Sequence, residues 1–148
     1  MIFDQNLDSS WWALRVGLGL AAFLAGLDKF FNLLSNWSMY LSPLAQRFLP
    51  FTAKTFMHII GPIEILVGLA ILTSWTRIGA YAAAVWLLAI AVNLVISGGF
   101  YDLAVRDVVM AIGAYALANL TEARDIARSA QDSDVRPMRQ PVRPVAAA

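Results

Sequence analysis

The chain has 148 residues, of which 59% are hydrophobic and 14% are charged, and its formal net charge is +1. Charged residues make up roughly 25% of an ordinary soluble domain, so this chain has too few of them to cover a small water-soluble globule. The near-neutral charge, without a basic stripe, argues against nucleic acid as a partner. The absence of cysteine excludes disulfides, thiol catalysis and Cys-ligated metal centres. The composition therefore predicts a small polytopic membrane protein.

Four segments are long and apolar enough to cross a membrane, which takes about 20 mainly apolar residues. In chain order they are residues 11–31, the interval between Lys54 and Arg77, residues 78–101 and residues 101–120. The residues before the first segment include Asp4 and Asp8 but no Lys or Arg. A signal peptide begins with a basic region instead, so we expect the first segment to be retained. The sequence predicts an all-α, four-helix transmembrane bundle.

Turn and capping signals mark the ends of these segments. Asp8-Ser9-Ser10 offers N-cap side chains for the first helix. Residues 73–76 predict a tight turn after the second helix, and Ser97-Gly98-Gly99 is expected to end the third. Aromatic residues that favour the headgroup level of a membrane stand at the predicted ends, namely Trp11, Trp12, Trp37, Tyr40, Trp75 and Tyr101.

One long connection, residues 32–54, joins the first and second segments. Ser42 is a typical N-cap, and Pro43 follows it at the first position of a short helix. Leu41, Leu44 and Phe48 then share one side of that helix. We expect an interfacial segment that lies over one end of the bundle, and the alternative is an ordinary loop with buried anchors.

Residues 121–148 differ from the membrane domain of residues 1–120, because they are rich in charge and contain two Arg-Pro pairs. They predict a frayed helix followed by a disordered tail. Basic residues near the helix ends gather on the side of the termini, as Arg15, Arg77, Arg124, Arg128, Arg136, Arg139 and Arg143. The opposite side has Lys29, Arg47, Lys54 and Arg106. This asymmetry predicts a multi-pass protein of the bacterial inner membrane with both termini and the tail in the cytoplasm.

Polar residues inside the apolar segments are the candidates for function, because ionisable groups there are costly and usually face the bundle interior. Glu64 shares a helix face with Gly61 and Gly68, and Asp107 shares one with Ala111, so both acids lie on stripes that permit close helix contact. We predict one buried polar cluster in the half of the bundle away from the termini. Its core members are Lys29, Glu64, Asn93, Arg106 and Asp107, and the further candidates for a ligand-binding or structural role are Asp28, Trp86 and Asp102.

Two interpretations of this cluster remain open: interhelical pairs that only fix the packing, or a site for a ligand or for protons. Glu64 is the candidate catalytic residue for proton handling, and we expect it to pair with Lys29 or Arg106. Asp102 and Arg106 have the four-residue spacing of a helical ion pair.

Trp86 and Asn93 lie seven residues apart on one helix face and suit a planar ligand with a carbonyl group, although a core tryptophan would show the same pattern. His58 is the single histidine, so one chain cannot supply a bis-His haem site. The sequence contains no metal-ligand cluster.

Four short motifs resemble the DoxX family of small four-helix bacterial membrane proteins, over roughly residues 11–120. They are Arg15-Val16-Gly17, Gly26-Leu27-Asp28-Lys29, Gly61-Pro62-Ile63-Glu64 and Arg77-Ile78-Gly79-Ala80. The family includes the DoxD-type small subunit of thiosulfate:quinone oxidoreductase. In that branch the resemblance implies a partner subunit and electron delivery to a quinone. Many members end with a Gly-x-Gly-x-x-Ser-x-Asp type motif, where this chain has Tyr101-Asp102-x-x-x-Arg106-Asp107, so we transfer no catalytic residue from the family.

Three functions therefore remain open. The first is a quinone-interacting or membrane-anchoring subunit of an oxidoreductase assembly, with quinone as the possible cofactor. The second is a non-catalytic scaffold, assembly or export factor that docks a partner protein through the long loop and the charged tail. The third is a small-solute or proton carrier, for which four short helices leave little room. The expected partners are the lipid bilayer and either a protein subunit or further copies in a homo-oligomer.

Overall fold

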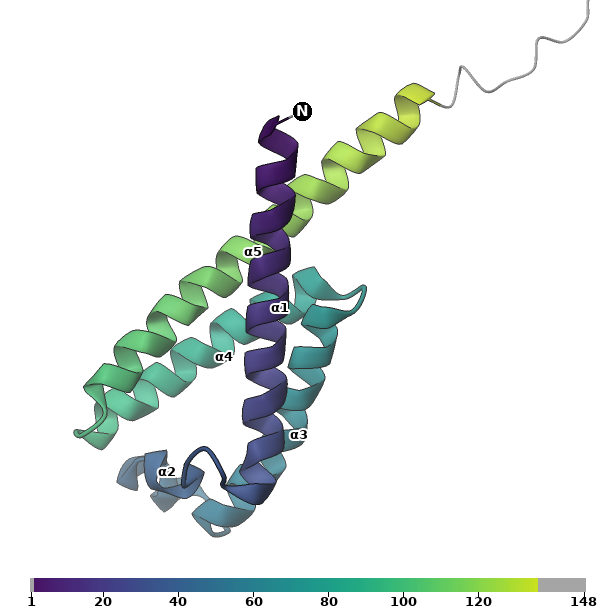
Figure 1. The fold of residues 1–148 in the computed structure, drawn as a ribbon. Coiled ribbons are helices and arrows are strands. Elements are labelled where there is room, and N and C mark those ends of the chain that lie inside the picture. The colour runs from purple at the N-terminus through teal and green to yellow at the C-terminus, as the bar shows by residue number, and fades with distance from the viewer. Residues whose placement is uncertain (1, 136–148) are drawn as a thin grey trace, which may run out of the picture.

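The computed structural model describes residues 2–135, and the regular elements in that range are all helices (Figure 1). The long helices are α1 (Ile2–Phe31), α3 (Ala53–Leu72), α4 (Thr76–Ser97) and α5 (Tyr101–Val135), and the short ones are η1 (Trp37–Tyr40) and α2 (Pro43–Phe48). Each of the four long helices contains a stretch long and apolar enough to cross a membrane. This confirms the predicted all-α, four-helix architecture of a multi-pass membrane protein.

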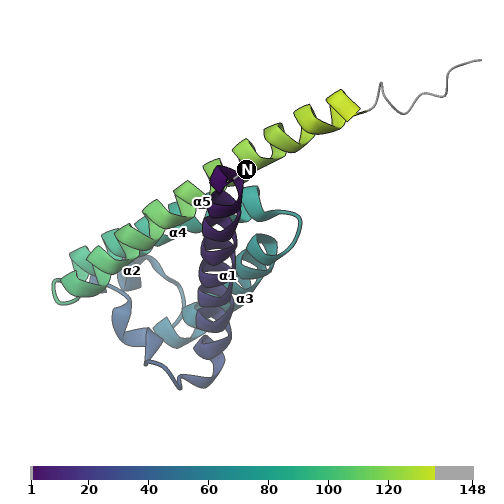
Figure 2. The ribbon, with the colours of Figure 1, turned by 45° about the horizontal axis from the view of Figure 1, so that its top comes forward.

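The long helices form two pairs, since α1 packs mainly against α3 and α4 packs mainly against α5. The pairs meet near the start of α1 and diverge towards η1 and α2, as the two ribbon views show (Figures 1 and 2). We call the end where they meet, around Trp11 and Leu117, the closed end, and the end with residues 32–52 the open end. The start of α1 and the end of α5 both extend outward from the closed end (Figure 1).

The α1–α3 pair is held by glycines that let the two backbones approach closely. A Cβ atom built on Gly26 would lie 2.6 Å from the carbonyl oxygen of Gly61, and one built on Gly68 would lie 2.7 Å from that of Gly19. No side chain fits at such separations, so these positions require glycine. The predicted close contact along the Gly61–Gly68 face is confirmed.

Alanines play the same part between α4 and α5 at the closed end. Ala111, Ala114 and Ala118 on α5 are almost completely buried, as the small-residue stripe on this helix predicted. Larger side chains fill the space between the two pairs. The buried core there comprises Trp11, Ile71, Ala80, Ala83, Ala84, Ala114, Leu117 and Ala118.

Polar contacts fasten three helices together at the closed end. The Arg15 guanidinium of α1 donates hydrogen bonds to the carbonyl oxygens of Ile71 (2.9 Å) and Leu72 (2.7 Å), the last residues of α3. The Trp11 indole donates to Thr121 Oγ1 of α5 at 2.8 Å. Arg124 of α5 lies 3.9 Å from the centre of the Trp11 ring. A cation at the end of a helix satisfies carbonyl groups that have no partner within the helix.

Helices α1 and α5 extend beyond the membrane segments predicted for them, residues 11–31 and 101–120. The expectation that Asp8-Ser9-Ser10 caps α1 is wrong, because α1 begins at Ile2 and the Ser9 and Ser10 hydroxyls donate to the carbonyl of Asn6 inside the helix. At the other end, α5 continues to Val135, so the helix expected after the membrane segment is continuous with that segment. The predicted tail is thus helical over residues 121–135, and its remainder lies outside the described residues.

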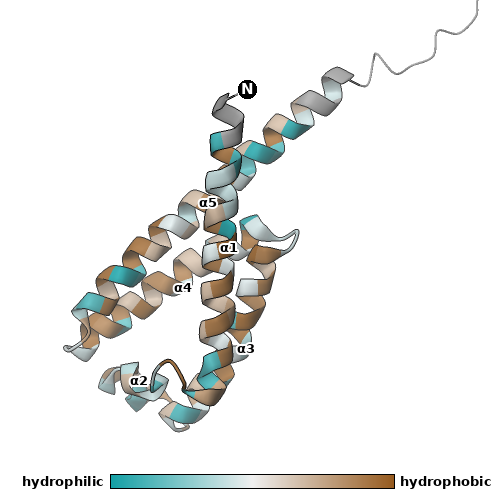
Figure 3. Ribbon diagram, in the orientation of Figure 1, coloured by the Kyte–Doolittle hydropathy of each residue, from teal (hydrophilic) through white to brown (hydrophobic). Residues whose placement is uncertain are grey.

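Hydropathy changes along these extended helices. Hydrophobic residues follow the four long helices through the bundle, whereas hydrophilic residues gather where α5 projects beyond it (Figure 3). The helix ends also match the sequence signals. Helix α4 ends at Ser97, and its C-cap Gly98 has a φ of 76°, the left-handed conformation that glycine adopts readily. Ser42 caps α2 by accepting a hydrogen bond from the Ala45 amide at 3.1 Å.

Candidate functional site

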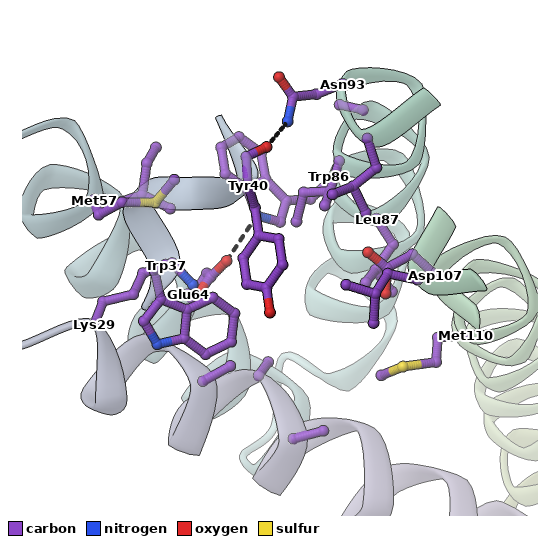
Figure 4. A pocket seen from close by; sticks show the side chains of 18 of the residues that line it. Lys29, Trp37, Tyr40, Met57, Glu64, Trp86, Leu87, Asn93, Asp107 and Met110 are labelled. Atoms are coloured by element: carbon purple, nitrogen blue, oxygen red, sulfur yellow. Dashed lines mark hydrogen bonds and ion pairs between the residues drawn. The ribbon is translucent and has the colours of Figure 1, made fainter. Parts of the chain in front are cut away.

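The two helix pairs diverge around a cavity of about 730 Å³ at the open end (Figure 4). Residues from all four long helices, from η1 and from α2 line it, and most of them are apolar. On the α1 side the lining consists largely of alanines (Ala21, Ala22 and Ala25), whose short side chains leave space unfilled. A volume of this size lies within the range of small-molecule sites, about 300–1,000 Å³.

An ion pair between α1 and α3 forms the most buried polar contact of the cavity wall. Lys29 Nζ donates to Glu64 Oε2, and the two side chains are only 5% and 8% exposed. The other Glu64 oxygen, Oε1, accepts a hydrogen bond from the Trp86 indole of α4 at 3.2 Å (Figure 4). The sequence left Lys29 and Arg106 as alternative partners for Glu64, and the structure places Lys29 there. Glu64 thus connects α3 to α1 and to α4.

The loop after α1 folds back over this ion pair. Asp28 accepts hydrogen bonds from the amides of Leu33 (2.9 Å) and Leu34 (3.0 Å) and from the Trp37 indole (2.8 Å). The Trp37 ring thereby lies 3.9 Å from the ammonium of Lys29, in cation–π contact. Asp28 is buried and holds the loop, and it does not line the cavity.

Asn93 of α4 holds the middle of the same loop. Its Nδ2 donates to the carbonyl of Tyr40 at 2.7 Å, and its Oδ1 accepts from the amide of Ser42 at 3.0 Å. Asn93 and Trp86 both line the cavity, as expected for one helix face. However, the Asn93 amide is engaged with the loop backbone on both sides, and the Trp86 indole is engaged with Glu64. The loop is therefore a cover that is fixed to α1 and α4.

The α5 wall carries the second acid of the site. The Asp107 side chain is 7% exposed, and its Oδ1 lies 3.4 Å from both Nε and Nη2 of Arg106. Arg106 lines the cavity but its side chain is 61% exposed. Asp102 is exposed and is not part of the lining, and Arg106 faces Asp107 instead of forming the expected pair with Asp102. Both contacts are long and both reach Oδ1, so Oδ2 of Asp107 has no hydrogen-bond partner among the described residues.

All five core members of the predicted polar cluster line this one cavity. Lys29, Glu64, Asp107 and the Asn93 amide make the contacts described above, and Arg106 lies at the edge of the cavity with its head group towards the outside. The cluster is therefore brought together as predicted, but it surrounds an open space and Arg106 is not buried.

Two aromatic residues of the loop contribute to the cavity wall in a way that the sequence did not predict. Trp37 and Tyr40 line the cavity, although they were interpreted only as residues at the membrane interface. Their position depends on how the loop folds back onto Asp28 and Asn93, and no periodic pattern in the sequence signals such a fold. His58 stacks on Phe30 outside the cavity lining, and its Nε2 is buried without a hydrogen-bond partner among the described residues.

Among the side chains that the structure describes, no group of three or more from His, Cys, Asp or Glu is arranged to hold a metal ion. No protein-family model, curated protein or solved structure matches the chain.

Proposed function

We propose that this protein binds a lipophilic molecule with a polar ring in the cavity at the open end, and that a quinone is that molecule. In this proposal the chain is a DoxX-like, quinone-interacting subunit of an oxidoreductase assembly in the bacterial inner membrane, with both termini in the cytoplasm. The observation that carries the proposal is a mostly apolar cavity of about 730 Å³ inside a membrane-spanning bundle, with a buried ion pair and half-buried indole groups in its wall.

The chemistry of the wall suits such a ligand. Apolar and aromatic side chains favour the ring and the hydrocarbon tail, and a small number of placed polar groups orients the ring. Lys29 has donors beyond the one that it gives to Glu64, since an ammonium carries three. Reduction of a quinone consumes two electrons and two protons. A partner subunit or a soluble donor would supply the electrons, and Glu64 would pass protons to the ring oxygens.

Ligand binding is tested by filling the cavity. Ala25 lines it, so Ala25→Leu should displace the ligand, whereas Ala13→Leu on an exposed position of the same helix should not. The protein is purified in mild detergent, extracted with organic solvent and assayed for copurified quinone, and decyl-1,4-benzoquinone is then titrated against the tryptophan fluorescence. We expect quenching in the wild type and in Ala13→Leu, and much weaker quenching in Ala25→Leu. Equal responses of the two variants would contradict the proposal.

The proposed orientation has a separate test. Topology reporters inserted at Asn36 in the loop and at the C-terminus should report opposite sides of the membrane, with the C-terminal reporter in the cytoplasm. A periplasmic signal from the C-terminal reporter would reverse the orientation and leave the binding proposal untouched.

A second candidate, the docking of a partner protein, is favoured by the length of α5. Its 35 residues extend over about 50 Å at 1.5 Å per residue, whereas a bilayer core is about 30 Å thick. The charged part of α5 that follows Arg124 thus projects beyond the bundle (Figure 1). A chain shortened after Ala130 should retain quinone binding and lose a copurifying subunit if this helix docks the partner. Retention of that subunit would contradict the docking role.

A further inference from the structure

Asp107 has a carboxylate oxygen that the protein leaves unused. Its side chain is more than nine-tenths buried and lines the cavity (Figure 4). Both contacts from Arg106 reach Oδ1, at 3.4 Å, and Oδ2 has no hydrogen-bond partner among the described residues. This oxygen can therefore accept a hydrogen bond from a ligand in the cavity.

The kind of partner follows from the chemistry of the group. Asp107 forms an ion pair with Arg106, and an ionised carboxylate only accepts hydrogen bonds. A ligand group that meets Oδ2 must therefore donate. A ring hydroxyl does so, whereas a ring carbonyl would place its own oxygen against the carboxylate.

A second polar group lies elsewhere in the wall of the same cavity. The Lys29–Glu64 pair, contributed by α1 and α3, offers both a donor and an acceptor, and Asp107 comes from α5. The side wall between them includes the aromatic rings of Trp37 and Tyr40 (Figure 4). One end of the site is thus tolerant of a carbonyl or a hydroxyl, and the Asp107 end is selective for a hydroxyl.

We infer that the cavity prefers the reduced, dihydroxy form of its ring ligand over the oxidised dione, and that Asp107 sets this preference. The inference rests on the proposed function, because it takes the ligand to be a quinone-type ring. It concerns equilibrium binding alone and requires no electron transfer within this chain. A site that holds the hydroquinone more tightly retains the product when a partner reduces the quinone, or selects the substrate when a partner oxidises the hydroquinone.

The test compares the two redox forms of one probe on the purified full-length chain. Decyl-1,4-benzoquinone and its hydroquinone are titrated without oxygen, and the dissociation constants are measured by calorimetry. A hydrogen bond to a charged acceptor corresponds to about tenfold or more in affinity, so we expect the hydroquinone to bind about tenfold more tightly. The dimethyl ether of the hydroquinone has a similar ring but donates no hydrogen bond, and should bind as weakly as the quinone.

Two variants assign the preference to one residue. Asp107→Asn replaces an acceptor-only group by an amide that also donates, and should bring the affinity ratio of the two forms close to one. Asp102→Asn removes the same charge from an exposed position of the same helix and should leave the ratio unchanged. The dimethyl ether titration needs only the wild type, so the inference stays testable if Asp107→Asn does not fold.

The outcomes separate the two proposals. Equal affinity for the two redox forms, tighter binding of the quinone, or tight binding of the dimethyl ether would overturn the role of Asp107 and leave the quinone site standing. An unchanged ratio in Asp107→Asn would do the same. If the wild type binds neither redox form, the proposed function itself fails.

Discussion

The closed end and the open end of the bundle use the same small residues for opposite purposes. At the closed end, Ala114 and Ala118 of α5 are completely buried, and they let α4 and α5 touch. At the open end, Ala21 and Ala25 of α1 line an open cavity. A short side chain permits close contact where a partner helix is present and leaves space where the helices diverge. The angle between the helix pairs therefore decides whether a small residue permits helix contact or leaves a cavity.

The polar groups of the two ends differ in the same way. At the closed end, the Arg15 guanidinium donates hydrogen bonds to the end of α3, and the Trp11 indole donates one to Thr121 of α5. At the open end, Asp107 keeps an unused oxygen and Lys29 has donors beyond the one that it gives to Glu64, and both residues line the cavity. A fully satisfied network contributes to packing, whereas an unsatisfied one is available to a ligand.

The largest loss of stability is expected from breaking the buried ion pair between Lys29 and Glu64 at the open end. Lys29→Met leaves Glu64 buried without its cation, and breaking a buried ion pair by removing one partner costs about 3–5 kcal/mol. We expect a strong loss of thermal stability in detergent. The double variant Lys29→Met with Glu64→Gln removes both charges and should recover most of that loss. A double variant no more stable than the single one would show that the cost does not arise from the unpaired acid.

The glycine contact between α1 and α3 should give the next largest effect. In Gly26→Ala the added Cβ meets the backbone of Gly61 and Ile65, so the helices must separate. Overpacking of this kind costs about 1–3 kcal/mol. Gly17→Ala is the matched control, because nothing lies within 4 Å of a Cβ at that position of the same helix. Similar melting temperatures for the two variants would contradict the close α1–α3 contact.

Matched tryptophan substitutions should separate stability from binding. Trp11→Phe at the closed end and Trp86→Phe at the open end each remove one indole hydrogen bond, to Thr121 and to Glu64 respectively. Each should lower stability by about 1 kcal/mol. Binding of decyl-1,4-benzoquinone, measured by calorimetry, should weaken in Trp86→Phe and stay unchanged in Trp11→Phe. A change of affinity in Trp11→Phe would show that the two ends are not independent.

Part of the candidate site was predictable because the membrane limits where charges can lie. Lys29, Glu64 and Asp107 had to face the interior, and counting residues along each helix placed them at one depth. The same counting could not choose between Lys29 and Arg106 as the partner of Glu64. That choice depends on the rotation of α5, which turns Asp107 into the cavity and leaves Arg106 mostly exposed.

The sequence by itself determined the four long helices, their order, the turns at residues 73–76 and at Gly98, and the short capped helix after Ser42, because these features depend on local hydropathy, capping and backbone freedom. Only the tertiary structure decided that the helix pairs diverge, that a cavity opens between them, and that Trp37 and Tyr40 cover it. The angle between two helix pairs is set by contacts between residues far apart in the chain. Local patterns carry no information about that angle, so the cavity became visible only in the assembled bundle.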